Sequence, residues 1–356
     1  MFLLQASVAF IVAFSIVAIS TPFIRRLALR WRLGHKPNGR KVCSNTIPHV
    51  GGIGMAIGTL VAIALTGVLF DGGTLSLLGR MLLPVILIVT LGIADDTKSL
   101  RAGQKLTIQV FAAVIVVFAG IQLVTGLRLL DQSSLFALLF TCFYLVGISS
   151  SVNLIDGLDG LAGGLSAISA GTFCVLAALL GAQPLLVVSL AVAGACVAFL
   201  IYNFPPGRIY MGDTGSMFLG LVLGIIACSF TMLQPTINTF VGVGFILMIP
   251  MVDSWLAIAR RLALHTPVFQ ADSLHMHHVL LLLGCSPRQT LAILYFMQAV
   301  MAILGVLTTK GLVLPMILGF ALVGLIYVSF IRIMVASKER SETVSAKLAS
   351  IPSLEK

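Results

Sequence analysis

Apolar residues follow one another along most of this chain in long runs, and short polar segments separate the runs. Eleven runs have the length of about 20 residues that a helix needs to cross a bilayer. They lie at about 1–24, 50–70, 77–94, 106–126, 134–152, 161–181, 183–202, 215–232, 236–258, 290–308 and 312–334. The runs lack the two-residue alternation of membrane barrel strands. The pattern therefore predicts an all-α integral membrane protein with about eleven transmembrane helices.

The composition supports this class. Of the 356 residues, 59% are hydrophobic and 10% are charged, whereas soluble proteins contain about 25% charged residues. The mean hydropathy is +1.11. A soluble chain could not bury so much apolar surface, because much of any folded surface meets water. We expect one membrane domain over residues 1–335 and a polar, unstructured cytoplasmic tail over residues 336–356.

The basic residues predict the orientation. If the N-terminus lies outside, every Lys and Arg except Arg80, Arg128 and Lys310 falls on or near the inner side. This distribution follows the positive-inside rule, so we expect the C-terminus to lie in the cytoplasm. Topology and contact with anionic lipid then explain the net charge of +10. No aromatic platform accompanies the basic residues, so we expect no nucleic-acid partner.

The acidic residues predict a site on the same face. Apart from two in outer loops and three in the tail, all are aspartates that this topology places at or near the cytoplasmic face. They are Asp95, Asp96, Asp156, Asp159, Asp213, Asp253 and Asp272, and all six histidines of the chain fall on the same side. A hydrophobic chain that keeps its ionisable groups on one face is expected to use them there.

Three motifs carry these aspartates. Asp95 and Asp96 end the third run, and adjacent carboxylates repel each other unless a cation or a proton relieves them. Asp156 and Asp159 are three residues apart and would share one face of a helix, beside small glycines. Asp213 lies between glycines before a new helix. It is either a metal ligand beside phosphates at that helix N-terminus or a simple N-cap.

A fourth motif contains three histidines after Asp272, at 275, 277 and 278. They are either zinc ligands or, with Arg260 and Arg261, a clamp for phosphate. Mg²⁺ is the natural metal for the aspartate set, because it prefers oxygen ligands and binds through one or two carboxylates plus phosphates. Carboxylates, basic residues and a metal around phosphates are typical of phosphoryl transfer.

The chain resembles the polyprenyl-phosphate N-acetylhexosamine-1-phosphate transferases in four ordered segments, DDTKS, NLIDGLDGL, NFPPGRIYMGDTGS and HMHH. It is most similar to the branch that uses undecaprenyl phosphate and GlcNAc 1-phosphate. It is less similar to the muramoyl-pentapeptide transferases, whose histidine motif differs. The resemblance runs from about Lys36 to His278 and includes the eleven-helix plan.

The resemblance implies a reaction. UDP-GlcNAc, or a related UDP-HexNAc, would give its sugar 1-phosphate to undecaprenyl phosphate and release UMP, with Mg²⁺ or Mn²⁺ as cofactor. This is the first membrane step of a cell-envelope polysaccharide, such as the O antigen of lipopolysaccharide. The enzyme would lie in the bacterial cytoplasmic membrane, with its active site on the cytoplasmic face.

The resemblance also implies roles for single residues. The catalytic residues would be Asp95, Asp96, Asp156 and Asp159. The metal ligands would be Asp213 and Asp159. The substrate-binding residues would be Asn153, Asn203, Lys105, Arg261, His275, His277 and His278. His35 and Cys43 stand where the family usually has Asp and His, so the identity of the donor sugar stays open.

Two other classes fit less well. A secondary transporter predicts ionisable groups near the bilayer midplane and an inverted repeat, and the chain shows neither. An intramembrane aspartyl protease needs a GxGD motif, which the sequence around Asp213 lacks. The glycine pairs Gly54/Gly58 and Gly220/Gly224 predict close helix packing, either within the chain or at a homodimer interface.

Overall fold

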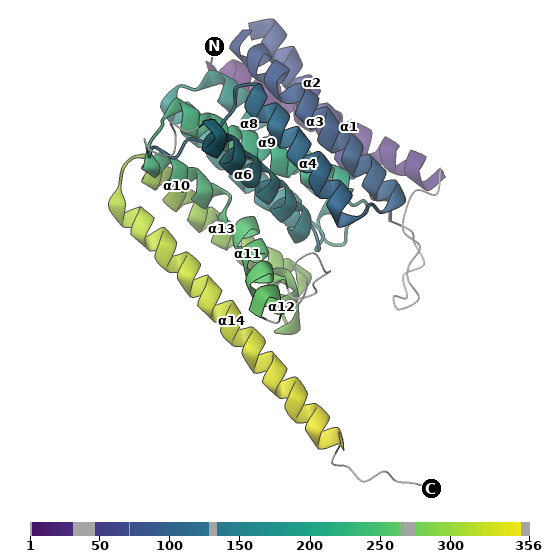
Figure 1. The fold of residues 1–356 in the computed structure, drawn as a ribbon. Coiled ribbons are helices and arrows are strands. Elements are labelled where there is room, and N and C mark those ends of the chain that lie inside the picture. Colours follow the sequence, from purple (N-terminus) through teal and green to yellow (C-terminus); the bar gives the residue numbers. More distant parts are fainter. Residues whose placement is uncertain are drawn as a thin grey trace.

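A computed structural model describes residues 2–30, 47–70, 72–127, 134–263, 265 and 275–349. Within these ranges the regular structure is helical throughout (Figure 1). The helices are α1 (Phe2–Arg30), α2 (Gly51–Phe70), α3 (Gly72–Lys98), α4 (Ala102–Phe118), α6 (Ser134–Ile155), α7 (Leu161–Leu180), α8 (Gln183–Asn203), α9 (Gly212–Leu233), α10 (Ile237–Ile246), α11 (Met248–Ala263), α12 (Met276–Leu282), α13 (Pro287–Thr309) and α14 (Val313–Ala349).

Each of the eleven predicted runs coincides with helix, which confirms a membrane protein with many spans. Nine helices of the described residues are long and apolar enough to cross a bilayer. α4 is shorter, because it ends at Phe118, before the end at 126 that the pattern predicts. The run at 236–258 was expected to be one helix, and this expectation is wrong: α10 and α11 are separate helices bent by 81°.

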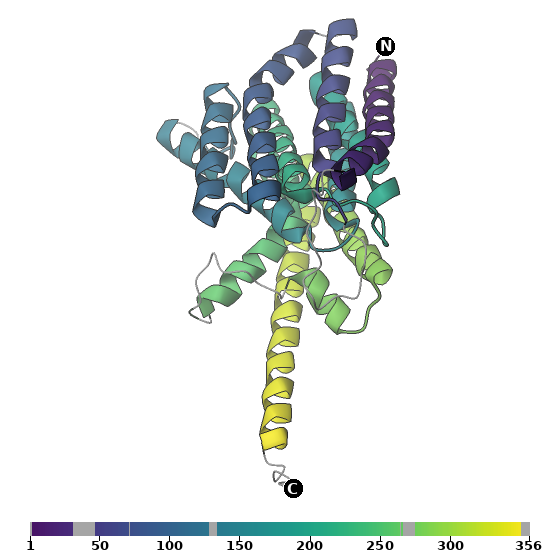
Figure 2. The same ribbon diagram turned by 90° about the vertical axis from the view of Figure 1, so that its right-hand side faces the viewer.

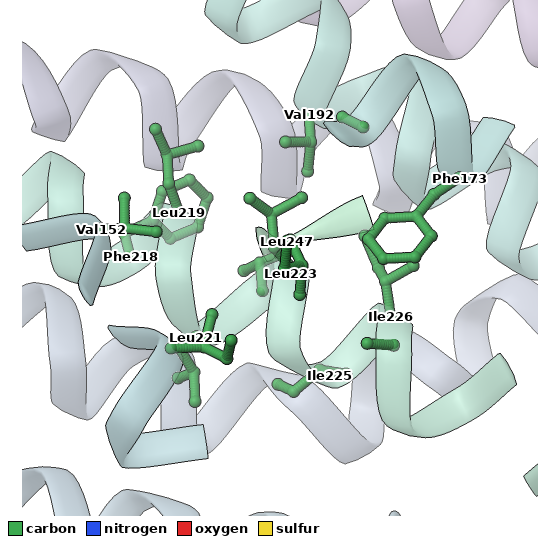
Figure 3. Close-up of a cluster of buried hydrophobic side chains, with 14 of the residues drawn as sticks. Val152, Phe173, Val192, Phe218, Leu219, Leu221, Leu223, Ile225, Ile226 and Leu247 are labelled. Atoms are coloured by element: carbon green, nitrogen blue, oxygen red, sulfur yellow. The ribbon is translucent and has the colours of Figure 1, made fainter. Parts of the chain in front are cut away.

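Helix α9 lies at the centre of the bundle. It packs against α2, α3, α6, α7, α8 and α10, and 18 of its 22 residues are buried. Figure 3 shows Phe218 and Ile226 of α9 among apolar side chains that include Val152 of α6 and Phe173 of α7. A helix that is apolar on every side is typical of a protein core or of a membrane span. The N-terminus of α9 is therefore held firmly in place.

The two glycine pairs are used inside the chain. A Cβ atom at Gly220 would lie 2.5 Å from the Cα atom of Ser149, so only glycine allows α6 and α9 to approach this closely. A Cβ atom at Gly58 would lie 2.7 Å from the side chain of Val17 on α1. Both contacts join helices of one chain, as close-packed membrane helices require.

Hydrogen bonds from neighbouring helices accommodate the break between α10 and α11. In a continuous helix the carbonyl of Ile246 would accept a hydrogen bond from residue 250, but Pro250 has no N–H group. The hydroxyl of Ser169 donates to this carbonyl at 2.8 Å, and Nε2 of Gln298 donates to it as well. Oε1 of Gln298 accepts the N–H of Ile249 at 3.2 Å. These bonds satisfy backbone groups that would otherwise be orphaned in an apolar interior.

Helix α14 extends well beyond the rest of the described helices (Figures 1 and 2). It has 37 residues and continues to Ala349. We expected an unstructured tail from residue 336. This expectation is wrong for residues 336–349, because α14 continues past its apolar part to Ala349. Residues 350–356 lie outside the described ranges.

Candidate active site

The acidic motifs meet around one cavity of about 390 Å³ at the end of the bundle where α3 ends and α9 begins. Its lining residues come from four separate segments of the chain. They are His49, Asp96, Asn153, Asp156, Gly157, Leu158, Asp159, Tyr210, Gly212 and Asp213. Four of the five predicted catalytic and metal-binding aspartates thus line the same space.

Asp96 holds the N-terminus of α9. Its carboxylate accepts the N–H of Asp213 at 2.8 Å, the N–H of Thr214 at 3.1 Å and the hydroxyl of Thr214 at 2.6 Å. The first N–H groups of a helix have no partner within the helix, and a carboxylate there also interacts favourably with the helix dipole. The helix is therefore capped by Asp96 from α3, and the alternative role of Asp213 as the N-cap is wrong.

Lys105 joins two of the acidic motifs. Its ammonium group contacts the carboxylate of Asp95 and lies 2.7 Å from Oδ2 of Asp213. Asp95 is buried and also accepts the N–H of Leu100 at 2.6 Å. Lys105 and Asp95 lie beside the cavity and are absent from its described lining. In this structure the positive charge of Lys105 therefore offsets the negative charges of Asp95 and Asp213.

Asp156 and Asp159 lie in the loop between α6 and α7, and the expectation that they share a helix face is wrong. Asp159 accepts the N–H of Gly207 at 2.8 Å, which ties this loop to the segment before α9. The carboxylate of Asp156 accepts no hydrogen bond from any described residue. Burial raises its pKa well above the usual range, and the negative charges of Asp213, Asp96 and Asp159 raise it further.

The two predicted asparagines have different surroundings. Asn153 lines the cavity, donates to the hydroxyl of Ser216 at 2.9 Å and also hydrogen-bonds Asp213. Asn203 is buried and lies outside the described lining of the cavity. Its Oδ1 accepts the N–H of Gly160 at 2.8 Å, and its Nδ2 donates to the carbonyl of Ile209 at 2.9 Å. Asn203 therefore links the two loops that form the cavity.

Helix α13 holds the same two loops from outside. The hydroxyl of Tyr295 donates to the carbonyl of Gly160 at 2.5 Å. The guanidinium of Arg288 donates to the carbonyl of Pro205 at 3.2 Å. These residues have no charge motif or spacing that would mark them in the sequence, so only the folded structure identifies them.

The histidine segment lies beside the cavity and does not line it in the described residues. His277 is buried, and its two ring nitrogens have no partner among the described residues. A Cβ atom at Gly157 would lie 2.4 Å from its Nε2, so His277 packs against the loop that carries Asp156. Burial, and to a smaller extent His278, lower the pKa of His277 to about 4. Its ring is therefore neutral at pH 7.

Asp253 belongs to the aspartates near the cytoplasmic face, and no sequence motif gives it a role. It is buried on α11, and its Oδ2 lies 2.7 Å from Nδ1 of His275. Its signal in the sequence is a single carboxylate inside an apolar run. Arg261 lies near the end of the same helix, half-buried and away from the described lining of the cavity. His35, Cys43 and Asp272 lie outside the described residues.

The donor atoms around the cavity suit a hard divalent cation. Mg²⁺ usually keeps several waters and is held by one or two carboxylates together with substrate phosphates. Among the described residues no three His, Cys, Asp or Glu side chains form a ready-made metal cage. Four carboxylates nevertheless line one cavity, and no residue within the described ranges donates a hydrogen bond to the carboxylate of Asp156. This arrangement fits a cation that protein and phosphate hold together.

Comparison with known proteins identifies the family. The model of glycosyl transferase family 4 matches residues 78–231. A probable undecaprenyl-phosphate N-acetylglucosaminyl 1-phosphate transferase of Bacillus subtilis is 33% identical over 85% of this chain and 84% of its own length. The chain belongs to glycosyl transferase family 4. Family membership confirms the resemblance seen in the sequence, and this family 4 protein is a phosphoglycosyl transferase.

Two further relatives show the breadth of the family. A decaprenyl-phosphate N-acetylglucosaminephosphotransferase of Mycolicibacterium smegmatis is 33% identical over 81% of this chain and 78% of its own length. A phospho-N-acetylmuramoyl-pentapeptide-transferase of Desulforudis audaxviator is 31% identical over 87% of this chain and 98% of its own length. The family match extends from α3 to α9 and contains all the aspartates of the cavity; the histidine segment lies beyond it.

Proposed function

We propose that this family 4 transferase moves GlcNAc 1-phosphate, or a related HexNAc 1-phosphate, from a UDP-sugar to undecaprenyl phosphate. An oxygen of the lipid phosphate attacks the sugar-bearing phosphorus of the donor. A new P–O bond forms, and the bond to the bridging oxygen breaks, so that UMP leaves with that oxygen. The product is a lipid-pyrophosphoryl-sugar, the first membrane intermediate of a cell-envelope polysaccharide.

The clustering of four carboxylates around one cavity carries this proposal. The second pKa of a phosphate monoester is about 6, so the lipid phosphate is largely a dianion at pH 7 and needs no strong base. The harder task is to bring two anionic phosphates together, and catalysis of this kind is mostly positioning and charge neutralisation. An acidic cavity performs that task only if it also takes up cations.

The cofactor in this proposal is Mg²⁺ or Mn²⁺. Asp213 and Asp159 would hold it, with Asp156 as a further oxygen donor. The bound cation supplies charge neutralisation for the phosphates. Asp96 keeps the N-terminus of α9 in place, and its exposed side is directed to the same cavity. Asn153 orients Asp213 through a hydrogen bond.

The proposed location is the bacterial cytoplasmic membrane, with the cavity on the cytoplasmic face. The basic residues support this orientation. Arg25, near the end of α1, donates to the carbonyl of Arg208 at 2.9 Å. Two segments that the charge pattern assigns to the inner side therefore meet. Lys105 belongs to the same group and contacts Asp213, so the basic end of the bundle is also the end with the cavity.

A muramoyl-pentapeptide donor is the second candidate, since relatives with that activity in their names also match. The GlcNAc transferases match at slightly higher identity. A membrane assay separates the two. It uses undecaprenyl phosphate, radiolabelled UDP-GlcNAc and Mg²⁺, with and without EDTA, and a parallel reaction with UDP-MurNAc-pentapeptide.

The proposal expects label in the lipid phase, release of UMP and loss of both with EDTA. If only another UDP-HexNAc gives labelled lipid, the proposed reaction stands and the donor sugar is a different one. Label from UDP-MurNAc-pentapeptide alone would favour the second candidate. If correctly inserted protein makes no lipid product from any UDP-sugar, the proposed function is wrong and an intramembrane carrier becomes the better hypothesis.

A further inference from the structure

Asp253 and His275 form a buried pair on two different elements. Asp253 lies on α11 and is 1% exposed, and His275 precedes α12 and is 6% exposed. Oδ2 of Asp253 lies 2.7 Å from Nδ1 of His275, and Oδ1 accepts the N–H of Met276 at 2.6 Å. One carboxylate thus fixes both the imidazole ring and the first N–H group of α12.

This geometry determines where the proton of His275 lies. An ionised carboxylate only accepts hydrogen bonds, and a neutral imidazole has one donor and one acceptor nitrogen. Because both oxygens of Asp253 face hydrogen-bond partners, Nδ1 must carry a proton to make its bond. Nε2 is then the nitrogen that is left to meet a ligand. A carboxylate that fixes the tautomer of a histidine in this way is a common device in metal sites and active sites.

The pair is connected to the cavity through the neighbouring histidine. The rings of His275 and His277 are nearly parallel, with an interplanar angle of 6° and 5.9 Å between their centroids. His277 in turn packs against Gly157, which lines the cavity. The ring of His275 therefore lies next to a histidine that contacts the cavity loop, and its orientation is set from α11.

We propose that Asp253 is a positioning residue of the transferase, which keeps the proton of His275 on Nδ1 and leaves Nε2 as the second nitrogen of a ring held beside the cavity. This inference rests on the proposed function for its consequence on turnover, and on geometry alone for the tautomer. The roles expected from the resemblance stopped at the histidines. The structure adds Asp253, which determines the tautomer of His275.

The substitution Asp253→Asn tests the proposal. An asparagine keeps the shape, its oxygen can accept the N–H of Met276, and its NH₂ group can donate to Nδ1 of His275. Both hydrogen bonds persist, but the proton of His275 must move to Nε2. We expect the melting temperature to change little and kcat/KM to fall by about 10–100-fold, as for other partners that fix the orientation and tautomer of a functional histidine.

Ser254→Ala is the matched control. Ser254 is the next residue on α11, is buried, and its hydroxyl has no partner among the described residues. Its loss should leave turnover unchanged. Asp253→Glu keeps an acceptor-only carboxylate on a longer side chain and should recover part of the activity that Asp253→Asn loses.

Histidine-selective ¹⁵N NMR of the full chain in detergent reads the tautomer directly, with His275→Gln to assign the signal. The proposal expects Nδ1–H in the wild type and Nε2–H in Asp253→Asn. An Nε2–H signal in the wild type would overturn the proposal, as would normal turnover of Asp253→Asn with a shifted tautomer. The NMR result does not depend on activity, so it stands even if the transferase assay fails.

Discussion

Asp96 shows how one side chain serves both the fold and the site. Its two oxygens together accept three hydrogen bonds from Asp213 and Thr214. In Asp96→Asn an NH₂ group would face N–H donors, and leaving such a group unpaired costs about 1–3 kcal/mol. We expect a lower melting temperature and a large loss of turnover.

Thr214→Val is the comparison for Asp96→Asn. It removes the hydroxyl and keeps both N–H groups bonded to Asp96, so it should cost about 1 kcal/mol, the value of one hydrogen bond. Melting temperatures in detergent measure both effects. Equal losses in the two variants would mean that Asp96 does not act by capping α9.

Asp213→Asn is expected to reduce turnover by orders of magnitude while the protein still inserts and folds. The substitution removes the negative charge that would hold a divalent cation, and it keeps the size of the side chain. The lipid-extraction assay measures the activity, and the yield of folded protein in detergent shows insertion. Asp131→Asn is the control, because the sequence places Asp131 in a loop on the opposite face. Near-normal turnover of Asp213→Asn would show that Asp213 is not a metal ligand.

The pKa of Asp156 predicts a pH dependence of metal binding. Because this pKa is raised, the carboxyl keeps its proton at pH values where an ordinary aspartate has lost it. A cation must displace that proton, so its apparent affinity falls as the pH falls. The Mg²⁺ concentration for half-maximal turnover should therefore rise at lower pH. Asp156→Asn should weaken this dependence, and an unchanged profile in that variant would assign the effect to another group.

At the scale of single residues, the sequence predicted that seven aspartates lie near one face of an otherwise apolar chain, and four of them, Asp96, Asp156, Asp159 and Asp213, line one cavity. It could not predict that Asp96 caps α9 or that Asp253 binds His275. Each of these contacts joins residues on helices that approach each other only in the folded bundle. Asp213 illustrates the limit: its position before a helix suggested a cap, and the cap comes from α3.

Among the elements, the break between α10 and α11 depends on Gln298. Gln298→Leu leaves the N–H of Ile249 without a partner and takes one donor from the carbonyl of Ile246. A buried unpaired group costs about 1–3 kcal/mol. We expect lower thermal stability, and we expect weaker turnover because α11 carries Asp253.

Pro250→Ala tests the reason for this arrangement. Alanine restores an N–H group that can reach the carbonyl of Ile246, so Gln298→Leu should cost less in the Pro250→Ala background than alone. A double-mutant cycle on melting temperature measures the coupling. Strictly additive losses would show that Gln298 and residue 250 do not share this carbonyl.

The sequence contained one signal for the break, since Pro250 lies inside the run at 236–258. A proline in the first turn of a helix needs no N–H group, so its presence alone does not distinguish a break from a continuous helix with a kink. The deciding partners, Ser169 and Gln298, come from α7 and α13. Their contribution depends on packing that hydropathy does not encode.

For the whole molecule, α14 has two parts with different expected importance. Its membrane part packs on the bundle, and the ring of Phe320 meets that of Phe245 edge to face with 5.2 Å between centroids. Its C-terminal part extends beyond the other helices (Figure 2). Deletion of residues 340–356 should therefore leave turnover in membranes unchanged, whereas deletion of 313–356 should destabilise the protein. Loss of turnover in the shorter deletion would give the extension a role in the reaction.

The bonds from α13 to the cavity have a consequence for how the protein is made. Every carboxylate of the cavity is synthesised before Arg288 and Tyr295, which hold its two loops through Pro205 and Gly160. A nascent chain that has just inserted α9 contains the acidic groups but lacks these anchors. The loops gain these two anchors only after α13 has entered the bilayer. Activity is thus expected to begin late in biosynthesis, when most of the chain has left the ribosome.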